Sequence, residues 1–233
     1  MIKVVIFDFD DTIVDNIKMD YESFSFPCKI FGINMKSFEE MVNLRKNKMK
    51  SNQIIQILLK ENNIEFEEFF NLREKFLADE ESFDLLELKK NTNKVLEFLN
   101  KNEIKVILCT SRDDTKKITE FLKKNQIIEY FSRIVSRDDL NLNFDNRSYL
   151  QRLFTKNILI KKILHIENSN HNEVLYIGNA KEDWIAAKNM MINFISFQNY
   201  YLTNNNFTDK NVTNMIEIIN EFEKINEVKK IEQ

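Results

Sequence analysis

Two aspartates near the N-terminus have the types and the spacing that phosphoryl transfer needs. Asp8 and Asp10 come directly after the apolar run Val4–Phe7, and two such positions share one face of a strand if its geometry persists. Paired carboxylates have pKa values that are driven apart unless a cation lies between them. We expect ionised Asp8 to be a nucleophile that forms an aspartyl-phosphate, and Asp10 to be the general acid and then the general base. The alternative is that these acids only solubilise a loop or cap a helix.

The apolar runs predict the elements that position these aspartates. The β-branched run before Asp8 is typical of a buried strand of a parallel sheet. Four more strands are predicted, at 104–109, 134–135, 174–177 and 192–197. Helical spacing of apolar residues separates them, and a last amphipathic helix runs through Met215 and Ile225. We interpret 140–147 as a loop and 204–206 as a linker. The pattern predicts an α/β fold whose ligands bind at the carboxyl ends of the strands.

The stretch from about residue 18 to 88 has helical periodicity throughout and fits no strand–helix–strand unit. We therefore expect two domains: an α/β core of residues 1–16 and 89–233, and an inserted helical domain of residues 17–88. Its basic residues are candidates for substrate contact by charge alone, although each is also explained as part of a solvated helix face: Arg45, Lys46, Lys48 and Arg73.

Further strand ends carry groups suited to a phosphate. Thr110 offers a hydroxyl and a main-chain amide where a strand opens into a helix, although a turn or cap role explains it equally well. Lys156 would pair with Asp8 and offset charge on the transferred group, and Lys161 and Lys162 compete for that role. Asp183 begins a helix, where dipole effects alone favour an acid, or else it lies beside the cation.

Composition limits the partners. The net charge is −3 and the pI is about 5.7, which gives no electrostatic reason to expect nucleic acid or an anionic membrane as a partner. No apolar run approaches the roughly 20 residues of a membrane span, and the N-terminal run is too short for a signal peptide. With only Cys28 and Cys109, a reducing cytoplasm is the expected setting. Each of the two glycines, Gly32 and Gly178, is expected to serve a positive φ or a close approach.

Taken in order, four segments resemble the motifs of the haloacid dehalogenase-like (HAD) superfamily. They are Asp8–Thr12, Ile107–Ser111, Lys156 and Tyr176–Asp183, and the resemblance covers nearly the whole chain. It implies a Rossmann-like core with strand order 5-4-1-2-3 and an α-helical cap in the inserted segment.

The resemblance also implies site roles residue by residue. Asp8 is the expected nucleophile and Asp10 the acid/base, with Thr110 and Lys156 completing the catalytic set. Thr110, Ser111 and Lys156 are expected to bind the phosphate. Mg²⁺ is expected on four residues: the Asp8 carboxylate, the Asp10 carbonyl, Asn179 and Asp183.

Family chemistry favours phosphoryl transfer over dehalogenation, because members that resemble the dehalogenases lack the acid that Asp10 supplies. Two positions depart from the family pattern: Asn179 stands where an aspartate is usual, and Asn157 stands where a proline usually follows the lysine. Loss of one carboxylate should lower metal affinity unless Glu182 or Asp183 takes the direct position.

The expected function is hydrolysis of a small phosphorylated metabolite, with no nucleic acid or membrane partner. The alternatives are a phosphomutase and, because of Asn179, a non-catalytic HAD-fold binding or regulatory protein. A receiver domain of a signalling relay also combines strand-end acids with Thr and Lys, but it is about half this length. The sequence does not identify the substrate or the oligomeric state.

Overall fold

The computed structural model describes residues 1–140, 149–198 and 210–231. The predicted linker at 204–206, and the predicted loop at 140–147 apart from its first residue, lie outside these ranges. The described residues form two compact units. The core unit comprises residues 1–14, 88–198 and 210–231, and the helical unit comprises residues 15–87.

The core unit contains a six-stranded sheet in the order β5-β4-β1-β6-β7-β8, with every adjacent pair parallel. The strands are β1 (Val4–Phe7), β4 (Lys105–Cys109), β5 (Phe131–Val135), β6 (Val174–Gly178), β7 (Asn193–Phe197) and β8 (Asn211–Val212). Read from β7 to β5, five of the strands follow the predicted order 5-4-1-2-3, so that prediction is confirmed. The edge strand β8 was missed, because two residues are too few to show strand periodicity.

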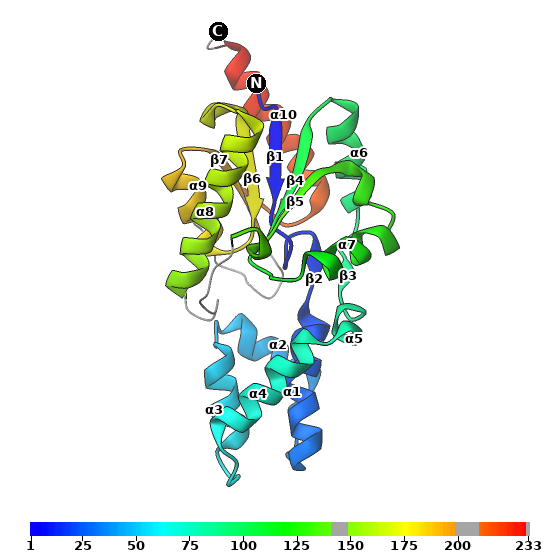
Figure 1. Ribbon diagram of the computed structural model, residues 1–233, viewed down its shortest axis with the longest axis vertical. Coiled ribbons are helices and arrows are strands. Elements are labelled where there is room, and N and C mark those ends of the chain that lie inside the picture. The colour runs from blue at the N-terminus through cyan, green and yellow to red at the C-terminus, as the bar shows by residue number, and fades with distance from the viewer. Residues whose placement is uncertain (141–148, 199–209, 232–233) are drawn as a thin grey trace. The chain divides into compact units, whose positions relative to one another are not determined.

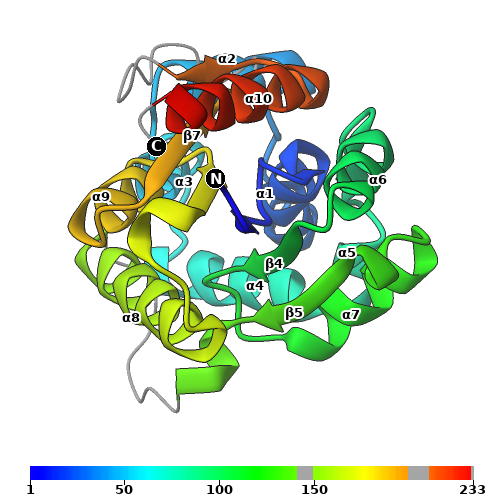
Figure 2. The same ribbon diagram turned by 90° about the horizontal axis from the view of Figure 1, so that it is seen from above.

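Helices cover both faces of this sheet. Figure 2 shows α8 (Tyr149–Glu167) and α9 (Lys181–Asn189) along one face, and α6 (Thr92–Lys101), α7 (Thr115–Lys124) and α10 (Met215–Ile231) along the other. Short 3₁₀ turns lie at Ile128–Tyr130, Arg137–Leu140 and His171–Glu173. The Asp114 side chain caps α7 by accepting a hydrogen bond from the Lys117 main-chain nitrogen at 2.9 Å, as its position before a helix predicts. No helix in the described part of the chain is long and apolar enough to span a membrane.

Alternation along β1 divides its side chains between the two layers of helices. Val4 and Ile6 join one apolar cluster with Ile107, Tyr176 and residues of α8 and α9 such as Leu159. Residues of β1 at odd positions point to the opposite face, and Phe9 continues that series by packing edge-on against Phe121 of α7 at 5.7 Å between ring centroids. In and just after β1, residues with even numbers therefore face α8 and α9, and residues with odd numbers face the opposite layer of helices.

The helical unit is built from five helices, shown in blue to cyan-green in Figure 1. They are α1 (Ile17–Phe31), α2 (Phe38–Lys46), α3 (Ser51–Leu59), α4 (Phe66–Ala78) and α5 (Glu80–Phe83). Their apolar faces enclose a core of their own around Phe24, Ile54 and Phe69. The chain enters through β2 (Val14–Asp15) and leaves through β3 (Glu87–Leu88), and these two strands pair with each other.

Two of the basic residues of this unit are not on a solvated face. Arg45 pairs with the Asp20 carboxylate through Nε and Nη2, both at 2.7 Å, and Arg73 reaches the same carboxylate at 3.1 Å. Both guanidinium groups lie against the ring of Phe24, and Arg73 is only 7% exposed. This buried ion cluster ties α1, α2 and α4 together, whereas Lys46 and Lys48 are exposed as a solvated face predicts.

Candidate active site

The carboxyl ends of β1, β4 and β6 bring the predicted site residues to one edge of the sheet. The Asp8 main-chain nitrogen donates to the Ile177 carbonyl at 2.9 Å and so extends the β1–β6 ladder one residue beyond Phe7. Asp8 therefore keeps the orientation of Ile6, two residues before it, and faces the layer of α8 and α9. Its position on that face explains why it meets a side chain of α8.

The side chain that Asp8 meets is Lys156, near the middle of α8. The Lys156 ammonium group forms an ion pair with Asp8 Oδ1, while the Thr12 hydroxyl donates to Asp8 Oδ2 at 3.2 Å. Asp8 and Lys156 are each only 5% exposed. Lys161 is exposed and Lys162 instead contacts Asp139, so Lys156 is the lysine that this edge of the sheet brings to Asp8.

A tyrosine and a second aspartate complete a buried network around Lys156. The Lys156 ammonium group lies 3.0 Å from Asp183 Oδ1, 3.1 Å from the Tyr176 hydroxyl and 3.3 Å from the Cys109 carbonyl oxygen. The Tyr176 hydroxyl donates to Asp183 Oδ1 at 2.6 Å, and Asp183 is 1% exposed. Lys156 is thus held between two carboxylates, and this hydrogen-bonded network fixes the position of its ammonium group.

The environment of this network shifts its pKa values. Burial, only partly offset by Lys156, raises the pKa of Asp8 to about 8, and the charges of Asp183 and Asp10 add to that rise. Burial would lower the pKa of Lys156, but Asp183 and Asp8 outweigh it and raise that pKa. Burial also raises the pKa of the Tyr176 hydroxyl, so Tyr176 stays a neutral hydrogen-bond donor to Asp183.

Asp10 does not share these partners, because the chain turns sharply after it. Asp11 has a φ of +57°, and the Asp10 carboxylate forms a two-pronged ion pair with Arg112: Nε to Oδ2 at 2.8 Å and Nη2 to Oδ1 at 2.6 Å. Burial would lower the pKa of Arg112, but the charge and hydrogen bonds of Asp10 outweigh it and raise that pKa. The two aspartates are thus given different environments, each with its own cation.

Thr110 and Ser111 lie in the turn that follows β4. The Thr110 main-chain nitrogen donates to the Val135 carbonyl at 3.0 Å and belongs to the sheet, so that amide is not the anion donor we expected. The Thr110 hydroxyl oxygen accepts from the Arg112 main-chain nitrogen at 3.2 Å, which leaves its own hydrogen to donate. Ser111, between them, is half-buried.

Gly178 and Asn179 bring the loop after β6 close to α9. Gly178 does not have a positive φ; an added Cβ would instead lie 2.7 Å from Cβ of Asp183. Gly178 is therefore needed because α9 lies too close for a side chain at this position. Gly32 instead serves a positive φ, of +67°, as the C-cap of α1. Asn179, which follows Gly178, is buried.

The fit of this site to Mg²⁺ depends on the oxygen donors that its residues offer. Both carboxylate oxygens of Asp183 accept protein hydrogen bonds, Oδ1 from Tyr176 and Oδ2 from the Ala180 main-chain nitrogen at 3.0 Å. The described residues contain no group of three or more His, Cys, Asp or Glu side chains able to hold a metal. The Asp8 carboxylate, the Asp10 carbonyl and the Asn179 amide are nonetheless hard oxygen donors of the kind that Mg²⁺ prefers. These three donors fit the ion with a single carboxylate among them. Asp183, the fourth ligand expected from the sequence, instead has both oxygens engaged by Tyr176 and Ala180.

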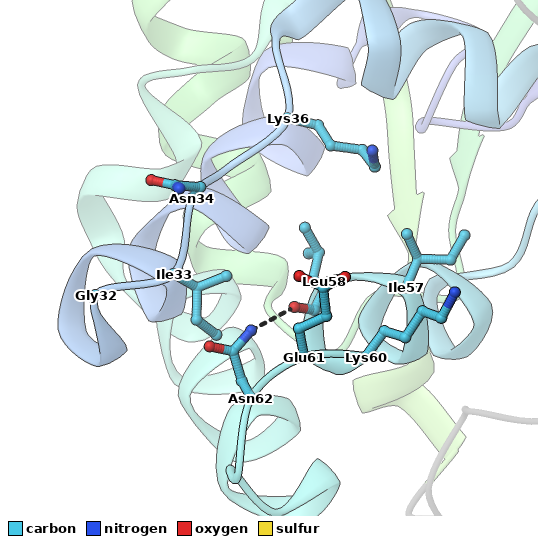
Figure 3. A pocket seen from close by; sticks show the side chains of 9 residues that line it. All are labelled: Gly32, Ile33, Asn34, Lys36, Ile57, Leu58, Lys60, Glu61 and Asn62. Atoms are coloured by element: carbon cyan, nitrogen blue, oxygen red, sulfur yellow. Dashed lines mark hydrogen bonds between the residues drawn. The ribbon is translucent and has the colours of Figure 1, made fainter.

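A hollow in the helical unit is a separate feature. It has a volume of about 390 Å³ and is shown in Figure 3 with its lining residues, Gly32, Ile33, Asn34, Lys36, Ile57, Leu58, Lys60, Glu61 and Asn62. The Asn62 amide donates to the Leu58 carbonyl at 3.1 Å beside it. Because this lining offers no paired carboxylates, the hollow is not a candidate for the chemistry of the sheet edge.

Arg112 and Tyr176 are the site residues that sequence reasoning missed. Tyr176 gave a weak signal, since it is the one hydroxyl in the apolar strand 174–177. Arg112 directly follows the Thr110–Ser111 pair, but its partner Asp10 is 102 residues away, and no local pattern predicts that contact.

The family model described as haloacid dehalogenase-like hydrolase matches residues 5–197. The chain therefore belongs to the haloacid dehalogenase-like hydrolase family, which confirms the predicted resemblance and makes the protein a hydrolase. No curated protein matches the chain significantly.

Solved structures with the same fold cover almost the whole chain. A subfamily IA hydrolase of this superfamily from Geobacter sulfurreducens has 17% identity and a TM-score of 0.70, covering 94% of this chain and 95% of its own. A predicted phosphoglycolate phosphatase from Haemophilus somnus has 17% identity and a TM-score of 0.70, covering 95% and 98%. A candidate β-phosphoglucomutase from Thermotoga maritima has 19% identity and a TM-score of 0.68, covering 96% and 99%. At these identities the likeness shows the fold.

Proposed function

We propose that the protein is a phosphomonoesterase that cleaves a small phosphorylated metabolite through an aspartyl-phosphate on Asp8. The observation that carries this proposal is the buried ion pair of Asp8 with Lys156 at the carboxyl end of β1. A nucleophile must be held in one orientation, and a cation beside it stabilises charge on the transferred phosphoryl group.

The proposed reaction gives the two aspartates different roles and needs Asp8 ionised and Asp10 protonated when the substrate is bound. An Asp8 carboxylate oxygen attacks phosphorus, the bond from phosphorus to the ester oxygen breaks, and that oxygen takes a proton from Asp10. Water then attacks the aspartyl-phosphate and gives a proton to Asp10, which releases inorganic phosphate and restores the Asp8 carboxylate. Thr110 donates its hydroxyl hydrogen to a phosphate oxygen, with Ser111 beside it, and Lys156 offsets the negative charge of the phosphate.

We propose Mg²⁺ as the cofactor, held by the Asp8 carboxylate, the Asp10 carbonyl and the Asn179 amide. When bound, the ion would neutralise part of the charge between an anionic carboxylate and an anionic phosphate. Asp183, whose oxygens are engaged by Tyr176 and Ala180, then acts by holding Lys156 in place.

We also propose that the helical unit, residues 15–87, is the cap that selects the substrate. The solved structures with this fold include proteins named for phosphoglycolate and for β-phosphoglucose chemistry, and both names indicate small phosphorylated molecules. Buried, unpaired thiols at Cys28 and Cys109 are consistent with a reducing cytoplasm.

The test is hydrolysis of p-nitrophenyl phosphate by the purified chain with and without Mg²⁺, beside the variant Asp8→Asn. This change keeps the shape of the side chain and removes the nucleophile. We expect Mg²⁺-dependent release of nitrophenol by the parent protein and none by the variant, which should still unfold in one cooperative transition. Equal activity in both proteins would show that Asp8 is not the nucleophile.

The alternatives give different outcomes in the same assay. A mutase would form the aspartyl-phosphate with an activated phosphate donor but transfer it to a sugar hydroxyl rather than to water. A non-catalytic binding protein would form no aspartyl-phosphate at any Mg²⁺ concentration, and the absence of both phosphate release and a phosphate adduct by intact mass would refute the proposal.

A further inference from the structure

Both carboxylate oxygens of Asp10 are held by one guanidinium group. Arg112 Nε lies 2.8 Å from Oδ2 and Nη2 lies 2.6 Å from Oδ1. In the proposed mechanism one of these oxygens must face the ester oxygen of the substrate. Asp10 therefore has to leave this two-pronged contact, or share it, before it can exchange a proton with the substrate.

A ligand can reach Arg112 far more easily than the other cation of the site. The side chains of Arg112 and Asp10 are 19% and 31% exposed, whereas that of Lys156 is 6% exposed. Lys156 is also committed to Asp8 and Asp183 on either side. An anionic group on the alcohol part of a substrate would therefore meet Arg112 rather than Lys156.

Arg112 is held in place by contacts that do not involve Asp10. Its guanidinium group lies 5.7 Å from the centre of the Phe9 ring. Its main-chain nitrogen donates to the Thr110 hydroxyl oxygen at 3.2 Å, and its carbonyl accepts from the Arg137 main-chain nitrogen at 3.0 Å. Arg112 can thus stay in position when Asp10 turns away, ready to accept a different carboxylate or a phosphate.

We propose that Arg112 is a specificity-determining residue that favours phosphomonoesters whose alcohol part carries a second anionic group. That group, a carboxylate or a second phosphate close to the ester oxygen, replaces Asp10 on the guanidinium group. The released Asp10 carboxylate then takes a proton from the solvent and gives it to the leaving oxygen. A neutral alcohol part leaves Arg112 on Asp10 and is cleaved slowly. This inference rests on the proposed phosphomonoesterase function and adds the substrate class.

The experiment compares two esters with the same carbon skeleton, 3-phosphoglycerate and glycerol 3-phosphate, which differ in a carboxylate against a neutral hydroxymethyl group. Release of inorganic phosphate is measured for the parent chain, Arg112→Gln and Arg112→Lys. A hydrogen-bonded pair with a charged group corresponds to about a ten- to hundred-fold change in kcat/KM. We expect the parent chain to prefer the carboxylate ester by about that factor.

In Arg112→Gln we expect kcat/KM for 3-phosphoglycerate to fall about ten- to hundred-fold, with a raised KM, while glycerol 3-phosphate is cleaved at least as fast as before. Arg112→Lys keeps the charge without the two-pronged geometry, so it should keep only part of the preference. The control Arg137→Gln removes an arginine that pairs with Asp113 near the same edge, and it should leave the ratio of the two esters unchanged.

Two results would overturn the inference. One is hydrolysis of both esters at similar kcat/KM by the parent chain, and the other is an equal loss on both esters in Arg112→Gln, which indicates only structural damage. Failure of the proposed function has a different signature, because the parent chain would then release no phosphate from either ester or from p-nitrophenyl phosphate.

Discussion

Replacing Gly178 with alanine should disturb the active site without touching any group that meets the substrate. A Cβ at this position would lie 2.7 Å from both Cβ and Oδ2 of Asp183 and 2.8 Å from its Cγ. Ordinary carbon contacts begin near 3.5 Å, so Asp183 would have to move by roughly 0.8 Å. The side chain that moves is the one that receives the Tyr176 hydroxyl at 2.6 Å and lies 3.0 Å from the Lys156 ammonium group.

The expected magnitude has two parts. Overpacking a buried site costs about 1–3 kcal/mol of unfolding free energy, and a weakened charged hydrogen bond to Asp183 adds to it, for a total of about 3 kcal/mol. Asp183 holds Lys156 in place, and a shift of nearly 1 Å passed on to Lys156 would lower the rate by about a hundred-fold. We therefore expect Gly178→Ala to lower both stability and kcat while leaving KM nearly unchanged.

The other glycine provides the matched control. Gly32 has a φ of +67° at the end of α1, and an added Cβ would meet nothing within 4 Å. Gly32→Ala should therefore cost about 1–2 kcal/mol from its left-handed backbone alone and leave phosphate release unchanged. Urea unfolding followed by circular dichroism, with initial rates on one substrate, measures both effects. If Gly178→Ala were as active and as stable as the parent chain, Asp183 would not be packed on Gly178 as described.

Two further predictions concern charge. Asn179→Asp adds a carboxylate to the proposed oxygen donors and should tighten Mg²⁺ binding by about ten-fold, measured by calorimetry; unchanged binding would place this residue outside the metal site. Asp20→Asn should destabilise the chain at pH 7 by about 3 kcal/mol, because it removes the carboxylate that buried Arg73 shares with Arg45 and leaves Arg73 with Glu74, whereas exposed Glu39→Gln should change little. Burial alone would raise the pKa of Asp20, but Arg45 and then Arg73 outweigh it and lower that pKa. Because the folded-state pKa of Asp20 lies below the unfolded value, this stabilisation is full above about pH 4 and is lost as the pH falls through the folded-state pKa. Urea unfolding at pH 7 and pH 3 should therefore show a smaller difference in stability between Asp20→Asn and the parent chain at pH 3. A difference that stays constant between the two pH values would contradict the assignment.

The sequence by itself determined the core strands and where they end. Apolar β-branched runs are local patterns, and the strands they predict at 104–109, 174–177 and 192–197 match β4, β6 and β7 within one residue at each end. The spacing of Asp8 from Ile6 likewise decided which face it occupies, since alternation along a strand is local geometry. The order of the strands came from the family resemblance rather than from periodicity.

The sequence analysis expected Lys156 to pair with Asp8, and the structure shows that pair, but only the tertiary structure decided the other charge pairs. Asp10 meets Arg112 across 102 residues, and Asp20 meets Arg73 across 53, and no local pattern carries such partners. The same limit applies to the glycines: the sequence singled out Gly178, but its close approach to Asp183 depends on how α9 packs behind β6. Local backbone preference determines where along the chain an acid or a turn lies. The packing of distant elements decides which cation contacts that acid. At this site, that packing gives Asp8 and Asp10 different cations and therefore different environments.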